Sequence, residues 1–159
     1  ACGTVSDIVA AGHIPAALEI LDDKTIQAIE ASVFKAGYPT DAAAVLLIEL
    51  DGPALVTQTA ATQIETLCRA REAIRVETAR DAADRLRLWK GRKGAFGAMG
   101  RISTDLYVLD GVVPRTQLIG TLNKIGEIGR KYRVKLTNVF HAGDGNLPRR
   151  FAPPSVNLT

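Results

Sequence analysis

One short stretch of this chain, residues 138–146 (NVFHAGDGN), holds the residue types best suited to chemistry. An apolar run leads to His141, and a Gly-Asp-Gly-Asn turn that contains Asp144 and Asn146 follows it. The two glycines of the turn tolerate positive φ, so the turn can gather the imidazole, carboxyl and amide groups around one point. The same pattern also fits a plain β-turn after a core strand, with His141 exposed or satisfied by a neighbour. Because short motifs match often by chance, spacing alone leaves both interpretations open.

Alternating helical and strand patterns must position this turn. Apolar spacing together with helix-capping and helix-stopping residues predicts five helices. They cover residues 4–11, the stretch from the capping residues 22–23 to Gly37, residues 53–67, a stretch that begins after Asp81, and residues 118–128. Strands are predicted over 17–21, 42–50, 74–78, 105–113 and 134–140. The nearly continuous apolar run in 42–50 indicates a central strand that is buried on both faces. The alternation alone would allow a parallel α/β sheet.

Four glycines recur at every third position after Trp89, at residues 91, 94, 97 and 100. Each costs a helix interior roughly 0.8 to 1 kcal/mol relative to alanine, so stability alone does not favour them. Close approach of another surface or ligand to the backbone would explain the repeat. A frayed or bent helix end would explain it equally well.

The composition excludes several classes of function. The 159 residues suit one domain, and 47% hydrophobic with 23% charged residues is an ordinary globular balance. The net charge of +3 comes from scattered residues and only 5% of the chain is aromatic, so we expect no nucleic-acid partner. No apolar run approaches the roughly 20 residues of a membrane span, and a signal-peptide pattern is absent, so we expect a cytoplasmic protein. Cys2 and Cys68 lack metal-ligand spacing and are expected to be free thiols.

Five separated blocks resemble, in the same order, the C-terminal domain of FAD-linked oxidases of the vanillyl-alcohol-oxidase type. The blocks are 12–19 (GHIPAALE), 36–41 (AGYPTD), 88–93 (LWKGRK), 100–103 (GRIS) and 141–147 (HAGDGNL). Five blocks in the right order are far more specific than the turn alone. Within the family the chain is most similar to the glycolate oxidases, and next to the D-lactate and D-2-hydroxyglutarate dehydrogenases.

The resemblance implies an α+β fold, in which helices cover an antiparallel sheet in a ferredoxin-like arrangement. It also implies FAD as the hydride acceptor, held mainly by a separate FAD-binding domain, and a small 2-hydroxy acid as the substrate. Other subunits of a glycolate oxidase are then candidate partners. Oxidation needs a hydride acceptor as well as a base, and no GxGxxG segment occurs here, so we expect this chain to be inactive alone.

The resemblance assigns substrate binding to Arg92, in the Trp-x-x-Arg block. A guanidinium can grip a carboxylate through two parallel hydrogen bonds, which also fixes its orientation. Without the resemblance, the pattern favours an arginine on a helix surface. Phe96 and Val108 stand where dehydrogenases for longer diacids place a threonine and a lysine. This difference suggests a small monoacid such as glycolate or lactate.

His141 is the candidate catalytic residue, and it corresponds to the first ligand in those family members that hold a divalent metal. The second histidine ligand falls at Pro148, which has no donor atom, and the downstream carboxylate is missing. Zinc sites generally use at least three protein ligands. We therefore expect a metal at His141 only in the intact parent, and none bound tightly to this chain. Asp144 and Asn146 are expected to shape the turn close to the cofactor.

The chain departs from the family pattern at both ends. Family members carry a strand before the helix predicted at 4–11, so residues 1–147 are predicted to be a partial domain whose first strand is missing. Residues 148–159 show no helical or strand period and break the family pattern in mid-motif. We expect these residues to be a non-native or disordered tail of a truncated fragment.

A second class of function fits the same residues. A non-catalytic α+β module could bind a ligand or a protein through its sheet or its glycine-rich helix. A flavin domain encoded upstream in the same frame would favour the oxidase, and a start codon beside Ala1 would favour the module. A sheet edge without a partner strand would also allow a homodimer.

Overall fold

A computed structural model describes residues 1–101, 107–109, 111–143 and 149–152. The described helices are α1 (Cys2–Ala10), α2 (Asp23–Glu30), α3 (Ala54–Ala70), α4 (Ala82–Met99) and α5 (Leu118–Tyr132), with a 3-10 turn η1 (Arg115–Gln117). The described strands are β1 (Ala17–Asp22), β2 (Ala44–Glu49), β3 (Tyr107–Leu109), β4 (Lys135–His141) and β5 (Arg149–Ala152).

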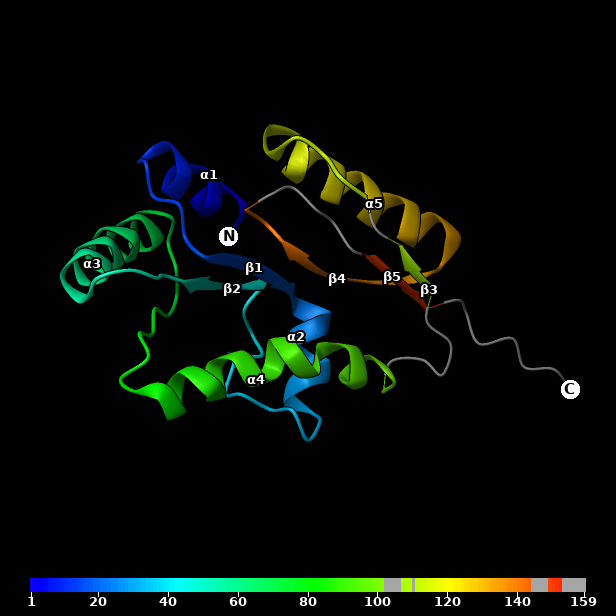
Figure 1. Cartoon of the computed structure of the whole chain (residues 1–159). Helices are drawn as coiled ribbons and strands as arrows, with labels where there is room; N and C mark the ends of the chain where they lie inside the picture. The colour runs from blue at the N-terminus through cyan, green and yellow to red at the C-terminus, as the bar shows by residue number, and fades with distance from the viewer. Residues whose placement is uncertain (102–106, 110, 144–148, 153–159) are drawn as a thin grey trace, which may run out of the picture.

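The described strands form one sheet in the order β2-β1-β4-β5-β3, and every neighbouring pair is antiparallel (Figure 1). The predicted α+β fold with an antiparallel sheet covered by helices is confirmed, and the parallel sheet that the alternation would allow is not formed. β1 and β4 lie side by side at the centre. Their register places Glu19 opposite His141 and Leu21 opposite Val139.

Helices cover both faces of the sheet (Figure 1). Side chains of α2 and α4 pack on one face, against Leu21 and Val139. Side chains of α1, α3 and α5 pack on the other face, against Ile20 and Phe140. Successive residues of a strand point to opposite faces, so Glu19 and His141 belong to the α2 and α4 side of the sheet.

Two helix starts follow from local hydrogen bonds that the sequence predicts. The side chain of Asp22 accepts a hydrogen bond from the backbone N–H of Thr25 at 2.9 Å, which caps α2. The side chain of Asp81 accepts one from the N–H of Asp84 at 2.8 Å, which caps α4. Each cap satisfies a backbone donor that the helix itself leaves without a partner.

The end predicted for α2 at Gly37 is wrong, because the helix ends at Glu30. The Glu30 carboxylate accepts hydrogen bonds from the backbone N–H groups of Ala36, Gly37 and Tyr38 at 2.9 to 3.0 Å. These bonds fold the following segment back around the Glu30 side chain instead of extending the helix. Val33, which the apolar spacing places on the buried face, is 79% exposed.

Two strand predictions are also wrong. β2 is an edge strand, whereas the apolar run 42–50 predicts a central one. Its apolar residues pack on both faces of the sheet, but within β2 only Leu47 is fully buried. Residues 74–78 form no strand, although their alternation predicts one. Arg75 instead donates a hydrogen bond to the carbonyl of Gly37 at 3.1 Å and pairs with Glu77. Sheet order and tertiary partners therefore override the local pattern.

At Gly91 and Gly94, the close approach of an aromatic ring to the helix backbone explains why glycine occurs. A Cβ at Gly91 would lie 2.4 Å from the ring of Tyr38, and a Cβ at Gly94 would lie 2.2 Å from the ring of Phe34. Both glycines lie within α4, which continues to Met99, so a frayed end at these positions is excluded.

β5 lies in a segment for which the sequence shows no period. Residues 149–152 pair with β3 on one side and β4 on the other, so these four residues have a place in the sheet that we did not predict. Positions 148 and 153–159 lie outside the described residues. In the strand predicted at 105–113, β3 covers 107–109, while 105, 106 and 110 also lie outside the described part.

Candidate functional site

Arg92 and His141 come from separate blocks of the sequence, and they meet at one buried carboxylate, that of Glu19. The Nε of Arg92 donates a hydrogen bond to the Oε2 of Glu19 at 2.9 Å. The Nδ1 of His141 pairs with the other oxygen, Oε1. The side chain of Glu19 is 5% exposed, that of Arg92 20% and that of His141 50%. The carboxylate therefore lies beneath the guanidinium, and the imidazole reaches the surface.

The sheet positions two members of this cluster. Glu19 on β1 is the register partner of His141 at the end of β4, so backbone pairing brings their side chains together on one face. The N–H of Ala142 then bonds to the carbonyl of Leu18 at 2.7 Å, which continues the pairing beyond His141. Backbone pairing between β1 and β4 therefore fixes the chain both before and after His141.

Arg92 comes from α4, and Tyr38 packs against the turn that precedes it. The hydroxyl of Tyr38 donates a hydrogen bond to the carbonyl of Leu88, and the ring lies where a Cβ on Gly91 would be. Burial raises the pKa of Tyr38 to about 12, so the hydroxyl stays a donor at physiological pH. Gly91 therefore allows the close packing that sets the position of Arg92.

Sequence reasoning assigned no role to Glu19, although it lies in one of the five blocks. The available signal is its place among apolar residues in the run 18–21 (LEIL). A carboxylate inside a buried strand needs a cationic or hydrogen-bonding partner, because an unpaired buried charge is very costly. Register then decides which partner it meets, and register is not visible in the sequence.

The other predicted site residues are only partly placed. Asp144 and Asn146 lie outside the described residues, so their roles stay predictions. Phe96 follows Arg92 by one turn of α4 and is 57% exposed, and Val108 on β3 is 42% exposed. Their effect on substrate size is untested.

The family assignment rests on a match along nearly the whole chain. The family model described as FAD linked oxidases, C-terminal domain, matches residues 1–154. The chain belongs to this family. It therefore shares the family with the glycolate oxidase subunit GlcD of Escherichia coli (strain K12), to which it is 46% identical over 143 residues. It is 40% identical over 147 residues to the subunit GlcD of Bacillus subtilis (strain 168).

These relatives are much longer than the stretch they share with this member of the FAD-linked oxidases. The aligned region covers 90% of this chain but 28% of the Escherichia coli protein, and 92% of this chain but 31% of the Bacillus subtilis protein. A solved structure of alkyldihydroxyacetonephosphate synthase superposes with a TM-score of 0.68 at 12% identity, covering 98% of this chain and 34% of that one. At this identity the structural match supports the fold alone.

Two cavities in the described part of this FAD-linked oxidase domain, of about 410 and 310 Å³, lie away from His141, and neither is lined by Glu19, Arg92 or His141. A flavin that oxidises a substrate must lie next to the groups that hold the substrate. Neither of these two cavities is therefore placed to hold a flavin against Glu19, Arg92 and His141.

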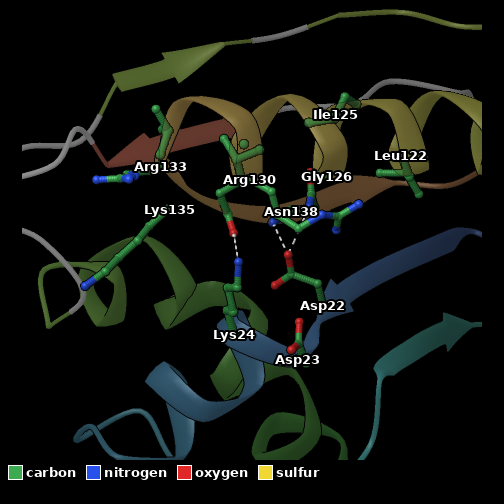
Figure 2. A pocket seen from close by; sticks show the side chains of 13 residues that line it. Asp22, Asp23, Lys24, Leu122, Ile125, Gly126, Arg130, Arg133, Lys135 and Asn138 are labelled. Atoms are coloured by element: carbon green, nitrogen blue, oxygen red, sulfur yellow. Dashed lines mark hydrogen bonds between the residues drawn. The ribbon is translucent and has the colours of Figure 1, made fainter.

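The larger cavity lies between α5, β4 and the start of α2 (Figure 2). The Oδ2 of Asp22 accepts hydrogen bonds there from the backbone N–H and the side-chain amide of Asn138, at 2.6 and 3.0 Å. Burial raises the pKa of Asp22 despite these bonds. Lys24 donates to the carbonyl of Leu136 at 3.3 Å. These polar groups hold α2 against β4.

The described residues do not fit a metal centre. Among them, no group of three or more His, Cys, Asp and Glu side chains is placed to hold a metal ion. His141 offers one imidazole, and both oxygens of Glu19 are engaged by Arg92 and His141. The prediction of a metal in the intact parent stays a prediction.

The two cysteines, Cys2 on α1 and Cys68 on α3, are free, as predicted, and both pack at the edge of the core. Burial raises the pKa of Cys2 and of Cys68, which disfavours the reactive thiolate. Within the described part of the chain, no helix is long and apolar enough to cross a membrane.

Proposed function

We propose that this domain binds the substrate of an FAD-dependent 2-hydroxy acid oxidoreductase of the glycolate oxidase type. Arg92 anchors the substrate carboxylate, and His141 accepts the proton of the substrate hydroxyl. The observation that carries the proposal is the convergence of these two side chains on Glu19. A cationic anchor and a base side by side are the two groups that this chemistry requires besides a hydride acceptor.

The geometry of Arg92 supports its role as anchor. Its Nε donates to Glu19, and the guanidinium has a second edge, which is made by its two terminal nitrogens. This edge has the fork shape that binds a carboxylate through two parallel hydrogen bonds. A side chain that is 20% exposed is accessible to a small acid and is also partly shielded from water, which strengthens the interaction.

The geometry of His141 supports its role as base. Its Nδ1 faces Glu19 and its side chain is half-exposed, so Nε2 is the nitrogen left for the substrate. A base must lie within hydrogen-bonding distance of the proton that it accepts. A 2-hydroxy acid carries its hydroxyl on the carbon next to the carboxylate, so one molecule can reach both groups.

The flavin, in this proposal, is bound by another part of the protein. The relatives named glycolate oxidase subunits are between three and four times as long as the region they share with this chain, which leaves room for such a domain. Bound FAD supplies the hydride acceptor. Phe96 and Val108 favour a small monoacid as the substrate, and other glycolate oxidase subunits are the proposed protein partners.

Steady-state kinetics of Arg92 variants test this function in the flavin-containing protein that carries the domain. Arg92→Ala should raise KM for glycolate or D-lactate by about 10- to 100-fold, because a hydrogen bond to a charged group contributes about 1.5 to 3 kcal/mol. Arg92→Lys should recover only part of the loss, since an ammonium cannot make the paired contact.

Lys93→Ala is the matched control, because Lys93 is the next residue of α4 and is exposed. It should leave KM unchanged. Wild-type kinetics in Arg92→Ala would refute the anchoring role. A protein that oxidises no small 2-hydroxy acid would instead favour the non-catalytic binding module.

A further inference from the structure

We propose that Glu19 is a positioning residue that orients Arg92 and His141 together for the substrate, an inference that rests on the proposed function. One carboxylate serves both side chains, because Oε2 accepts from Arg92 and Oε1 pairs with His141. The relative placement of anchor and base is therefore set by a single buried group.

The burial of Glu19 makes this arrangement specific. Its side chain is 5% exposed, and a buried carboxylate is stable only when charged or hydrogen-bonding partners replace the water that it loses. Glu19 belongs to the central strand β1, and its neighbours Leu18 and Ile20 are core residues. The carboxylate consequently cannot turn outward to solvent without disrupting the sheet, and Arg92 and His141 must come to it.

The contact with Oε1 selects one tautomer of His141. An ionised carboxylate only accepts hydrogen bonds, so Nδ1 must carry a hydrogen when it faces Oε1. In the neutral imidazole the other nitrogen, Nε2, then has a free lone pair. The carboxylate of a Ser-His-Asp triad orients its histidine in the same manner. Glu19 thus presents Nε2 as the acceptor for the substrate hydroxyl proton.

The contact with Oε2 orients Arg92. A hydrogen bond from Nε at 2.9 Å fixes the rotation of the planar guanidinium about its long axis. The terminal nitrogens then form the edge that the substrate meets. Glu19 touches neither substrate nor flavin in this proposal, and it acts only through its two partners.

A purely structural ion pair is the alternative, and Glu19→Gln separates the two. Glutamine keeps the shape and can still accept from Arg92 with its oxygen, but its amide donates to His141. Nδ1 must then become the acceptor, and the hydrogen moves to Nε2. The variant should therefore reverse the tautomer and remove the free lone pair from the side of the substrate.

The experiment uses the flavin-containing protein and compares Glu19→Gln with wild type in two measurements, and the NMR sample is treated with a chelator so that no divalent metal on His141 sets the tautomer. Heteronuclear NMR of the imidazole nitrogens should show Nδ1–H in the wild type and Nε2–H in Glu19→Gln. The kcat for the 2-hydroxy acid should fall about 100- to 10,000-fold, the contribution of a positioned general base, because Nε2 can no longer accept the proton. Glu49→Gln is the control, because Glu49 lies on the edge strand β2 and pairs with Arg85; its kcat and tautomer should be unchanged.

Glu19→Asp covers the case in which Glu19→Gln fails to fold. Aspartate keeps the charge but is shorter, so the Nδ1–H tautomer should persist while KM and kcat both worsen as the contact with Arg92 lengthens. An unchanged tautomer and kcat in Glu19→Gln, or unchanged KM and kcat in Glu19→Asp, would overturn the inference. If Arg92→Ala also leaves KM unchanged, the proposed function itself fails. If Arg92→Ala raises KM but the Glu19 variants leave KM, kcat and the tautomer unchanged, only the positioning role fails.

Discussion

At the scale of single residues, the site depends on one carboxylate that has two partners. Arg92 and His141 could be chosen from the sequence because each lies in a block that resembles the family. Glu19 could not, because its role depends on the register that places it opposite His141 and on the approach of α4. The missing information is the pairing of strands that are far apart in the sequence.

A second buried carboxylate, that of Asp84, leads to a prediction about acid stability. Asp84 on α4 accepts a hydrogen bond from the Nε of Arg87 at 2.9 Å and pairs with Arg80. The hydrogen bond from Arg87 is the main cause that lowers the pKa of Asp84 below its ordinary 3.8. Because the folded pKa is the lower one, this ionised group stabilises the fold above pH 3.8, and the contribution is lost as pH falls through the folded value.

Asp84→Asn should therefore lower the Tm at pH 7, and the difference from wild type should shrink as the pH is taken below about 3.8. Thermal unfolding followed by circular dichroism at several pH values measures this. Asp51→Asn, in the exposed turn after β2, is the control, and its Tm should equal that of the wild type at each pH. A Tm difference for Asp84→Asn that is constant from pH 7 to pH 3 would contradict the account.

At the scale of elements, α4 packs closely on the segment after α2 because glycine, which has no side chain, occupies the points of contact. Gly94→Ala should destabilise the fold by about 1 to 3 kcal/mol, because the added Cβ would lie 2.2 Å from the ring of Phe34. Gly120→Ala in α5 is the matched control, since a Cβ there meets nothing within 4 Å. It should be neutral or stabilise by up to about 1 kcal/mol. Urea unfolding of both variants measures the difference, and equal stability would refute the close packing.

The elements that the sequence predicts well are those with signals inside them. The caps at Asp22 and Asp81 begin α2 and α4, and the apolar run before His141 forms β4. Predictions fail where a distant partner decides the outcome. The Glu30 carboxylate ends α2 early, and the place of β2 at the sheet edge leaves most of its apolar residues half-buried. β5 has no period of its own and depends on β3 and β4.

At the scale of the whole molecule, the sheet ends at β2, which has one strand neighbour, β1, among the described residues. A strand with an open edge can pair with the same strand of a second copy. A homodimer through this edge stays a prediction. The weight-average mass measured by sedimentation should rise with concentration, and the β2 amides should become protected from hydrogen exchange. A species that is strictly monomeric at high concentration would exclude this association.

The central claim is that this domain holds a 2-hydroxy acid for a flavin bound elsewhere in the protein. Anaerobic flavin reduction tests it most directly, because it isolates substrate oxidation from the later electron acceptor. Glycolate or D-lactate should bleach the flavin absorbance of the wild-type protein, and Arg92→Ala should need about 10- to 100-fold more acid for the same rate. A flavin that no small 2-hydroxy acid reduces, or one that is reduced equally well in Arg92→Ala, would contradict the account.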